Sequence, residues 1–310
     1  LVTSACGDCL GTGAVSACHT GIRKTDAQGC KVNKRTEERK QEKNEKNRRE
    51  KQMAENRTER IRIGEIEASM HPTAIFRKIA VVGDSLSSGE LVSVGANGAY
   101  GYHDYFEYSW GQFIARELGA TVYNFSRGGM TAKEYTDGYA DAMRMWDPAR
   151  ATQCYLVALG VNDLLNLRMP VGSVADICPD DPEKNQPTFA GYYAKIIQRY
   201  RAMQPRAPFF LLTMPSEGDA DPVAEDIRAQ MAALLYALAD YFPDTYVIDL
   251  YRDGPVYDQA FRNLYMMNGH MTPAGYLFSA KLILRLWDRI LFAHPEKFHD
   301  VGFVGTDLYS

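Results

Sequence analysis

The sequence predicts a three-layer α/β/α fold around a central, mostly parallel sheet of five strands. Five short apolar segments have the length and composition of buried strands, at residues 78–82, 120–125, 155–159, 209–213 and 245–250. Amphipathic segments that fit helices lie between and after them, at residues 110–118, 131–146, 189–203, 222–241 and 272–292. Strands that alternate with helices form parallel sheets covered on both faces, so we expect this architecture here.

The first predicted strand ends in a turn that carries a serine beside an aspartate, Gly83-Asp84-Ser85. A side chain at the carboxyl end of a parallel strand faces the crevice where such folds bind ligands. The serine also begins the next helix, where free backbone N–H groups favour negative charge. This serine has the position of a nucleophile, although Gly-Asp-Ser is also common turn chemistry.

Three later segments carry polar groups at comparable positions. Gly129 follows the strand predicted at 120–125, and glycine lets a backbone N–H approach a ligand. Asn162 follows the strand predicted at 155–159 and offers a neutral side-chain donor. His270 lies in a turn before the last predicted helix, where a histidine is placed to act as a general base.

Taken in order, the serine turn, the glycine turn, the Gly-x-Asn-Asp segment and the late histidine resemble the SGNH/GDSL hydrolase family, over about residues 75–295. The resemblance implies the flavodoxin-like fold of that family and a serine hydrolase that cleaves carboxylic esters through an acyl-enzyme. It implies Ser85 as the nucleophile and His270 as the base. It also implies an oxyanion hole formed by the backbone N–H groups of Ser85 and Gly129 and by the Asn162 amide.

One position departs from the family pattern. The family has an aspartate three residues before the histidine, and this chain has Met267 there. The His270 ring could be oriented by a carboxylate from elsewhere such as Asp249, by a backbone carbonyl or by the Asn268 amide. The sequence alone does not decide between these alternatives. Losing the charge of the acid costs about four orders of magnitude in rate in a Ser-His-Asp hydrolase, so a slow enzyme or an inactive binding protein stays open.

Two aspartates beside the proposed site residues are expected to have supporting roles. Asp84 precedes the serine, and Asp163 follows the asparagine. We expect each to accept hydrogen bonds from loop N–H groups and to set its turn, because a second charged carboxylate near the oxyanion would oppose it.

An aromatic-rich segment, residues 100–110, is expected to form a loop after the nucleophile turn. Aromatic faces there can stack on sugar rings or line an acyl pocket, and the alternative is that the rings pack into the core. We expect a mixed outcome, with Tyr108 and Trp110 in the core. The expected substrate loop then consists of Tyr100, Tyr102, His103 and Tyr105.

The aromatic segment and the lack of a membrane element favour a small-molecule ester with a short acyl chain, such as an acetyl group on a carbohydrate. Lipases, lysophospholipases and thioesterases share this family and remain the alternatives. We expect no cofactor and no metal. Cys6 and Cys9 resemble half of a zinc-binding repeat, but zinc needs four ligands and the second paired spacing is missing.

The first 69 residues differ in composition from the rest. Residues 34–62 are an almost unbroken run of Lys, Arg, Glu, Asn and Gln, which cannot bury a face and forms either a solvated helix or a disordered segment. The chain begins with Leu, and Met70 stands just before the first predicted strand. We therefore interpret residues 1–69 as a disordered or non-native extension and residues 70–310 as the hydrolase domain.

Charge and hydropathy exclude several partner classes. The net charge is −4, and the globular part is acidic, which argues against nucleic-acid binding. No run of about eighteen apolar residues predicts a membrane span. No basic start followed by an apolar segment predicts a secretory signal, so we expect a cytoplasmic protein. The sequence makes no prediction of the oligomeric state.

Overall fold

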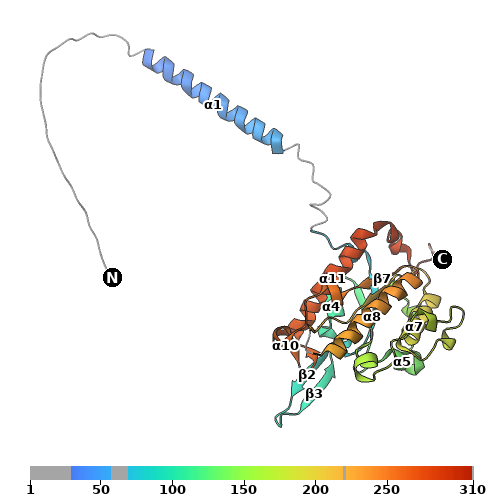
Figure 1. The fold of residues 1–310 in the computed structure, drawn as a ribbon. Helices are drawn as coiled ribbons and strands as arrows, with labels where there is room; N and C mark the ends of the chain where they lie inside the picture. The colour runs from blue at the N-terminus through green and yellow to red at the C-terminus, as the bar shows by residue number, and fades with distance from the viewer. Residues whose placement is uncertain (1–28, 57–68, 219–220, 309–310) are drawn as a thin grey trace, which may run out of the picture. The chain divides into compact units, whose positions relative to one another are not determined.

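The computed structural model describes residues 29–56, 69–218 and 221–308. The chain divides into two units, Leu1–Ala68 and Ser69–Ser310, which are described separately. In the first unit, helix α1 spans Gly29–Asn56 (Figure 1). Its described side chains between residues 39 and 51 are all exposed, which fits a sequence with no apolar stripe. The cysteine pair Cys6 and Cys9 lies outside the described residues.

The second unit is built on a five-stranded sheet in the order β4-β1-β5-β6-β7. Every pair of neighbours is parallel, which confirms the predicted architecture. The order is that of a doubly wound sheet, with a switch point beside its first strand. The strands are β1 (Lys78–Gly83), β4 (Thr121–Ser126), β5 (Cys154–Ala158), β6 (Phe209–Leu212) and β7 (Thr245–Ile248).

Helices cover both faces of the sheet, because successive side chains of a strand point to opposite sides. Ile79 and Val81 of β1 belong to one core cluster, together with side chains of α4 (Trp110–Leu118) and α11 (Pro273–Ala293). Ala80 and Val82 belong to the other cluster, together with α7 (Phe189–Met203) and α8 (Pro222–Tyr241). Figure 1 shows α8 and α11 among these covering helices. The four helices begin within one residue of the predicted positions, each behind a capping side chain: Ser109, Thr188, Asp221 and Thr272.

One predicted helix is broken. Residues 131–146 form α5 (Ala132–Glu134), a π-helical turn η3 (Tyr135–Tyr139) and α6 (Ala140–Ala142). Gly138 has non-helical dihedral angles in the middle of this segment, with φ of 158°. Glycine readily adopts such angles, so the prediction of one continuous helix over residues 131–146 is wrong.

The aromatic-rich segment is not a loop, and that prediction is wrong. Tyr100–Asp104 forms strand β3, which pairs antiparallel with β2 (Glu90–Val94). Figure 1 shows this ribbon reaching away from the central sheet. Trp110 is buried as expected, whereas Tyr108 is exposed, so its expected place in the core is wrong. Tyr100 and Tyr102 are spaced two residues apart, as side chains on one face of a strand are.

The remaining elements are short and connect the layers. None of the described helices has the length and apolar composition needed to span a membrane. The short elements are η1 (Pro72–Ile75), α3 (Ser85–Ser88), η2 (Phe106–Tyr108), η4 (Pro148–Arg150), η5 (Val161–Asn166), η6 (Val174–Asp176), η7 (Pro182–Lys184), α9 (Leu250–Asp253), α10 (Gln259–Tyr265), β8 (Met266–Met267), β9 (His270–Met271), η9 (Pro295–Lys297) and η10 (Val301–Phe303).

Candidate active site

The serine turn lies at the carboxyl end of β1. Ser85 is the first residue of α3, and the Asp84 carboxylate caps this helix by accepting a hydrogen bond of 3.0 Å from the Leu86 N–H. Asp84 is buried, and burial raises the pKa of its carboxyl from 3.8 to about 7. Ser85 itself stays partly accessible. The turn is therefore held rigidly while its serine faces outward.

A buried tyrosine fixes this turn from the last helix. The Tyr276 hydroxyl of α11 donates to the Ser85 carbonyl at 3.2 Å and to the Glu90 carbonyl at 2.9 Å. The Tyr276 side chain is fully buried. Sequence reasoning missed this role, because an apolar helical pattern predicts a buried tyrosine but not the direction of its hydroxyl.

The sheet order brings the expected oxyanion donors to either side of the serine turn. β4 and β5 both neighbour β1, and Gly83 pairs with Ser126 on one side and with Ala158 on the other. Gly129 follows β4 and adopts a φ of 72°, which favours glycine. Asn162 follows β5, and its amide donates to the Met130 carbonyl at 3.0 Å. Among the described residues, no second hydrogen bond donated by this amide is found.

Gly129 and Asn162 line the same recess, whose volume is about 490 Å³. Side chains with hydroxyl, ammonium, carboxylate and amide groups form most of its wall. They are Thr131, Lys133, Glu134, Asp137 and Asn166, with Leu167 as the apolar member. The recess thus presents several polar groups beside the two expected donors, while the hydrocarbon parts of these side chains form much of its wall.

Asp163 ties the asparagine turn to the glycine turn. Both of its carboxylate oxygens accept from the Ala132 N–H, at 3.0 and 3.1 Å. The side chain is buried, and burial raises the pKa of Asp163 to about 6. These contacts place Asp163 in the loop framework, behind the recess.

The histidine lies on a short hairpin made of β8 and β9. Met267 pairs directly with His270, and Asn268 and Gly269 connect the strands with φ angles of 46° and 82°. Two consecutive residues with positive φ are typical of a type I′ turn, for which Asn-Gly is the preferred sequence. The family's aspartate position is therefore occupied by a strand residue of the hairpin.

Three groups contact the His270 ring. The Asn268 carbonyl lies 3.4 Å from Nδ1, and a Glu90 carboxylate oxygen lies 3.7 Å from Nε2. The Tyr102 ring packs edge-on against the imidazole, at 5.4 Å between centroids. Of the alternatives for orienting the ring, a backbone carbonyl is the one near Nδ1, while the Asn268 amide donates to the Tyr102 hydroxyl instead. A proton on Nδ1 leaves Nε2 as the free base.

Asp249 is not brought to the histidine. One of its oxygens accepts from the Thr213 hydroxyl and the Arg252 N–H, and the other from the Tyr236 hydroxyl and the Arg252 guanidinium. These bonds cap α9 and use the acceptor capacity of the carboxylate. Burial opposes its charge, yet the hydrogen bonds outweigh this effect and lower the pKa of Asp249.

The expected substrate residues of the β2–β3 ribbon are exposed. Tyr100, Tyr102 and Tyr105 are each about half accessible. Tyr102 contacts the catalytic region through the His270 ring, whereas His103 bonds to the Ser93 hydroxyl on the ribbon itself. The structure thus brings one of these four residues to the histidine.

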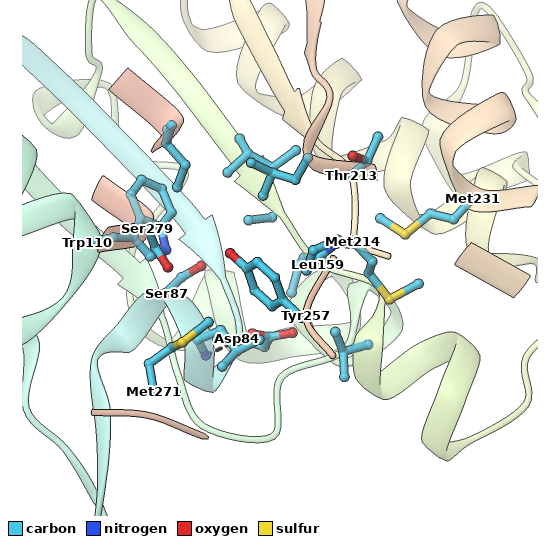
Figure 2. A pocket seen from close by; sticks show the side chains of 17 residues that line it. Asp84, Ser87, Trp110, Leu159, Thr213, Met214, Met231, Tyr257, Met271 and Ser279 are labelled. Atoms are coloured by element: carbon cyan, nitrogen blue, oxygen red, sulfur yellow. Dashed lines mark hydrogen bonds between the residues drawn. The ribbon is translucent and has the colours of Figure 1, made fainter. Parts of the chain in front are cut away.

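An apolar pocket of about 80 Å³ lies behind the serine turn (Figure 2). Leu86, Val161 and Met271 line it, and each is a chain neighbour of a proposed site residue. In Figure 2 the Tyr257 ring lies in the middle of the pocket residues, with Asp84 close to it. Among the residues that the structure describes, no cluster of three or more His, Cys, Asp or Glu side chains could hold a metal ion.

Solved structures share this fold. A protein from Lactobacillus plantarum aligns with a TM-score of 0.52 and 18% identity, over 71% of this chain and 98% of its own. A family 2 carbohydrate esterase with a carbohydrate-binding domain from Corynascus thermopiles (Myceliophthora fergusii) aligns with a TM-score of 0.48 and 18% identity, over 71% and 67%. A family 2 carbohydrate esterase from Clostridium thermocellum in complex with cellohexaose aligns with a TM-score of 0.47 and 16% identity, over 71% and 65%.

The alignment with the Lactobacillus plantarum protein shows a common fold and leaves the substrate open. No curated protein sequence matches this chain. The family model described as GDSL-like lipase/acylhydrolase matches residues 81–277, a range that contains the serine turn, both expected oxyanion donors and the histidine. The chain therefore belongs to the GDSL-like lipase/acylhydrolase family and is a hydrolase of ester bonds.

Proposed function

We propose that this protein is a serine esterase that removes short acyl groups, such as acetyl, from carbohydrates. The set of hydroxyl, ammonium, carboxylate and amide groups that line the recess beside Gly129 and Asn162 is the observation that carries the proposal. A hydroxyl-rich alcohol can hydrogen-bond to such a wall, whereas a long hydrocarbon chain would leave its polar groups unpaired. The exposed tyrosines of the ribbon add aromatic faces on which a sugar ring can stack.

The proposed chemistry uses the site residues that the family resemblance implies. His270 Nε2 takes the proton of the Ser85 hydroxyl, and the serine oxygen attacks the ester carbonyl. The resulting oxyanion is held by the backbone N–H groups of Ser85 and Gly129 and by the Asn162 amide. The intermediate collapses as the alcohol leaves with the proton from His270. Water then attacks the acyl-enzyme with His270 again as base, and the free acid and Ser85 are regenerated.

A second candidate substrate is an ester with a longer acyl chain. The apolar pocket of Figure 2 favours it, because the pocket is lined mainly by hydrophobic side chains and lies directly behind the serine turn. A lipase or thioesterase would use such a space for several methylene groups. The two candidates differ in the acyl chain length that the enzyme prefers.

Hydrolysis of p-nitrophenyl acetate, butyrate and octanoate, together with acetylated xylose, tests the proposal. We expect acetate to be cleaved fastest and Ser85→Ala to lower kcat by about four to six orders of magnitude, since the nucleophile is lost. Ser93→Ala is the matched control, because this exposed serine lies on the ribbon. Faster hydrolysis of octanoate would select the longer chain. Equal rates for wild type and Ser85→Ala would reject Ser85 as the nucleophile.

A further inference from the structure

We propose that Glu90 is a positioning residue for His270 and takes over the electrostatic role that the family gives to an aspartate at the position of Met267. The inference rests on the proposed Ser85 and His270 chemistry. Its basis is a carboxylate that lies against the ring nitrogen which gains the proton during catalysis.

The distance and burial place Glu90 at the base. A Glu90 carboxylate oxygen lies 3.7 Å from His270 Nε2, and the two side chains are only 12% and 20% exposed. Among the described residues, no other carboxylate forms an ion pair with this histidine. The separation is longer than a hydrogen bond, so the interaction is an attraction between charges in a partly desolvated space.

The direction of the contact gives it a consequence for proton transfer. The Asn268 carbonyl lies on the Nδ1 side of the ring, so Nε2 is the nitrogen that accepts the serine proton. Before transfer, the neutral imidazole lies beside the carboxylate and gains little from its charge. After transfer, a charged imidazolium faces it, which is favourable. Glu90 therefore shifts the equilibrium towards the protonated base and the activated serine.

Three site segments hold Glu90 in place. It begins β2 directly after Gly89, whose φ of 78° ends the serine helix. Its carbonyl accepts from the Tyr276 hydroxyl that also bonds to Ser85. On the glycine turn, a Cβ at Gly128 would lie 2.1 Å from the other Glu90 carboxylate oxygen, so a side chain there would displace the carboxylate from its present position.

Titratable groups face Glu90 from β9, β3, the serine turn and α11: besides burial, the Glu90 charge contributes to the raised pKa of Asp84 and of Tyr276. Burial raises the pKa of the Glu90 carboxyl, the His270 ring on β9 lowers it, Asp104 on β3 raises it, and His103 on β3 lowers it. The Asp104 carboxylate is already used, since it accepts from the Ser88 hydroxyl and from the Gly128 N–H. Glu90 has no such bond to loop groups in the described chain, which leaves its charge directed at His270.

The experiment compares the full chain with its Glu90→Gln, Glu90→Asp and Glu107→Gln variants in p-nitrophenyl acetate hydrolysis from pH 5 to 9. Gln keeps the size of the side chain and removes its charge. We expect Glu90→Gln to lower kcat about tenfold or more and to move the acid limb of the kcat/KM profile to lower pH. KM should change little. Glu90→Asp keeps the charge but moves it farther from His270. Its kcat and the acid limb of its kcat/KM profile should therefore lie between those of wild type and Glu90→Gln.

Glu107→Gln is the matched control, because Glu107 is exposed and pairs with Arg116, away from the histidine. Identical pH profiles for Glu90→Gln and Glu107→Gln would overturn the inference. A loss of kcat with an unmoved acid limb in both Glu90 variants would also overturn it, since it indicates a merely structural role.

A second readout separates this inference from the proposed function. Titration of the His270 imidazole signal by NMR needs no turnover, and we expect its midpoint to fall in Glu90→Gln relative to wild type and Glu107→Gln. An unchanged midpoint rejects the role of Glu90. Absence of esterase activity, or full activity in Ser85→Ala, rejects the proposed function and leaves the NMR result to decide on Glu90.

Discussion

The serine turn and the histidine hairpin carry the two halves of the proposed catalytic pair, and they are built differently. Asp84, Tyr276 and the end of β1 hold the serine turn with buried hydrogen bonds. The hairpin Met266–Met271 has two ladder pairs and a two-residue turn, and its His270 ring touches only partly exposed groups. The proposed nucleophile is thus held by the core, whereas the proposed base is held by a local turn and lies near the Glu90 carboxylate.

This difference explains how the site can lack the family's aspartate. An acid at the position of Met267 would orient the ring from within its own loop. Here the hairpin orients the ring through its backbone, and the nearest carboxylate, that of Glu90, comes from the segment that follows the nucleophile. In our proposal, His270 then depends for its stabilising charge on Glu90, which follows the serine turn in the chain.

The largest expected effect concerns the stability of the serine turn. Because burial raises the pKa of Asp84 from 3.8 to about 7, the folded state holds a proton between these pH values that the unfolded chain has released. Stability therefore falls as pH rises from 4 to 7, and the loss is complete above 7. Asp84→Asn has no charge to bury. We therefore expect its free energy of unfolding, measured with urea, to exceed that of wild type by up to about 4 kcal/mol at pH 8.5. This difference should shrink towards pH 4.

Asp249→Asn is the matched control with the opposite sign. The pKa of Asp249 is lowered, so its charge stabilises the folded state above pH 4, and this contribution is lost as pH falls through the lowered value. The Asn variant should be less stable than wild type at neutral pH. If the difference in unfolding free energy between Asp84→Asn and wild type stays constant with pH, the assignment of a buried carboxyl with a raised pKa is contradicted.

The two regions also differ in how far the sequence predicted them. The positions of Ser85, Gly129 and Asn162 at neighbouring strand ends follow from local motifs and from the order of parallel strands. The partner of His270 does not, because Glu90 and Asp249 are both carboxylates near strand ends and only tertiary packing decides which one meets the ring. The Tyr276 hydroxyl was missed for the same reason. The β2–β3 ribbon was missed because its aromatic residues were interpreted by composition rather than by their period of two.

On the histidine side, Gly269→Ala is expected to weaken the hairpin. Gly269 has a φ of 82°, and a side chain in this region costs about 1–2 kcal/mol although no atom lies within 4 Å of the added Cβ. A displaced ring lowers kcat as well, by up to about a hundredfold for a shift of 1 Å. Gly302→Ala is the control, since that glycine has equal space and no positive φ. Equal thermal stability and kcat in the two variants would show that the turn does not set the ring.

The smallest expected effect on stability tests the connection between the two regions. Tyr276→Phe removes a hydroxyl that bonds to the carbonyls of Ser85 and Glu90, which costs about 1 kcal/mol. Tyr193→Phe is matched to it, because Tyr193 is equally buried and donates to the Val157 carbonyl at 2.8 Å in the core. We expect similar losses in thermal unfolding but a fall in kcat only for Tyr276→Phe, by about tenfold, because a slightly misplaced nucleophile and a loosened Glu90 both raise the barrier. Equal kcat values in the two variants would mean that the core holds the serine turn without this tyrosine, and that the two regions are set independently.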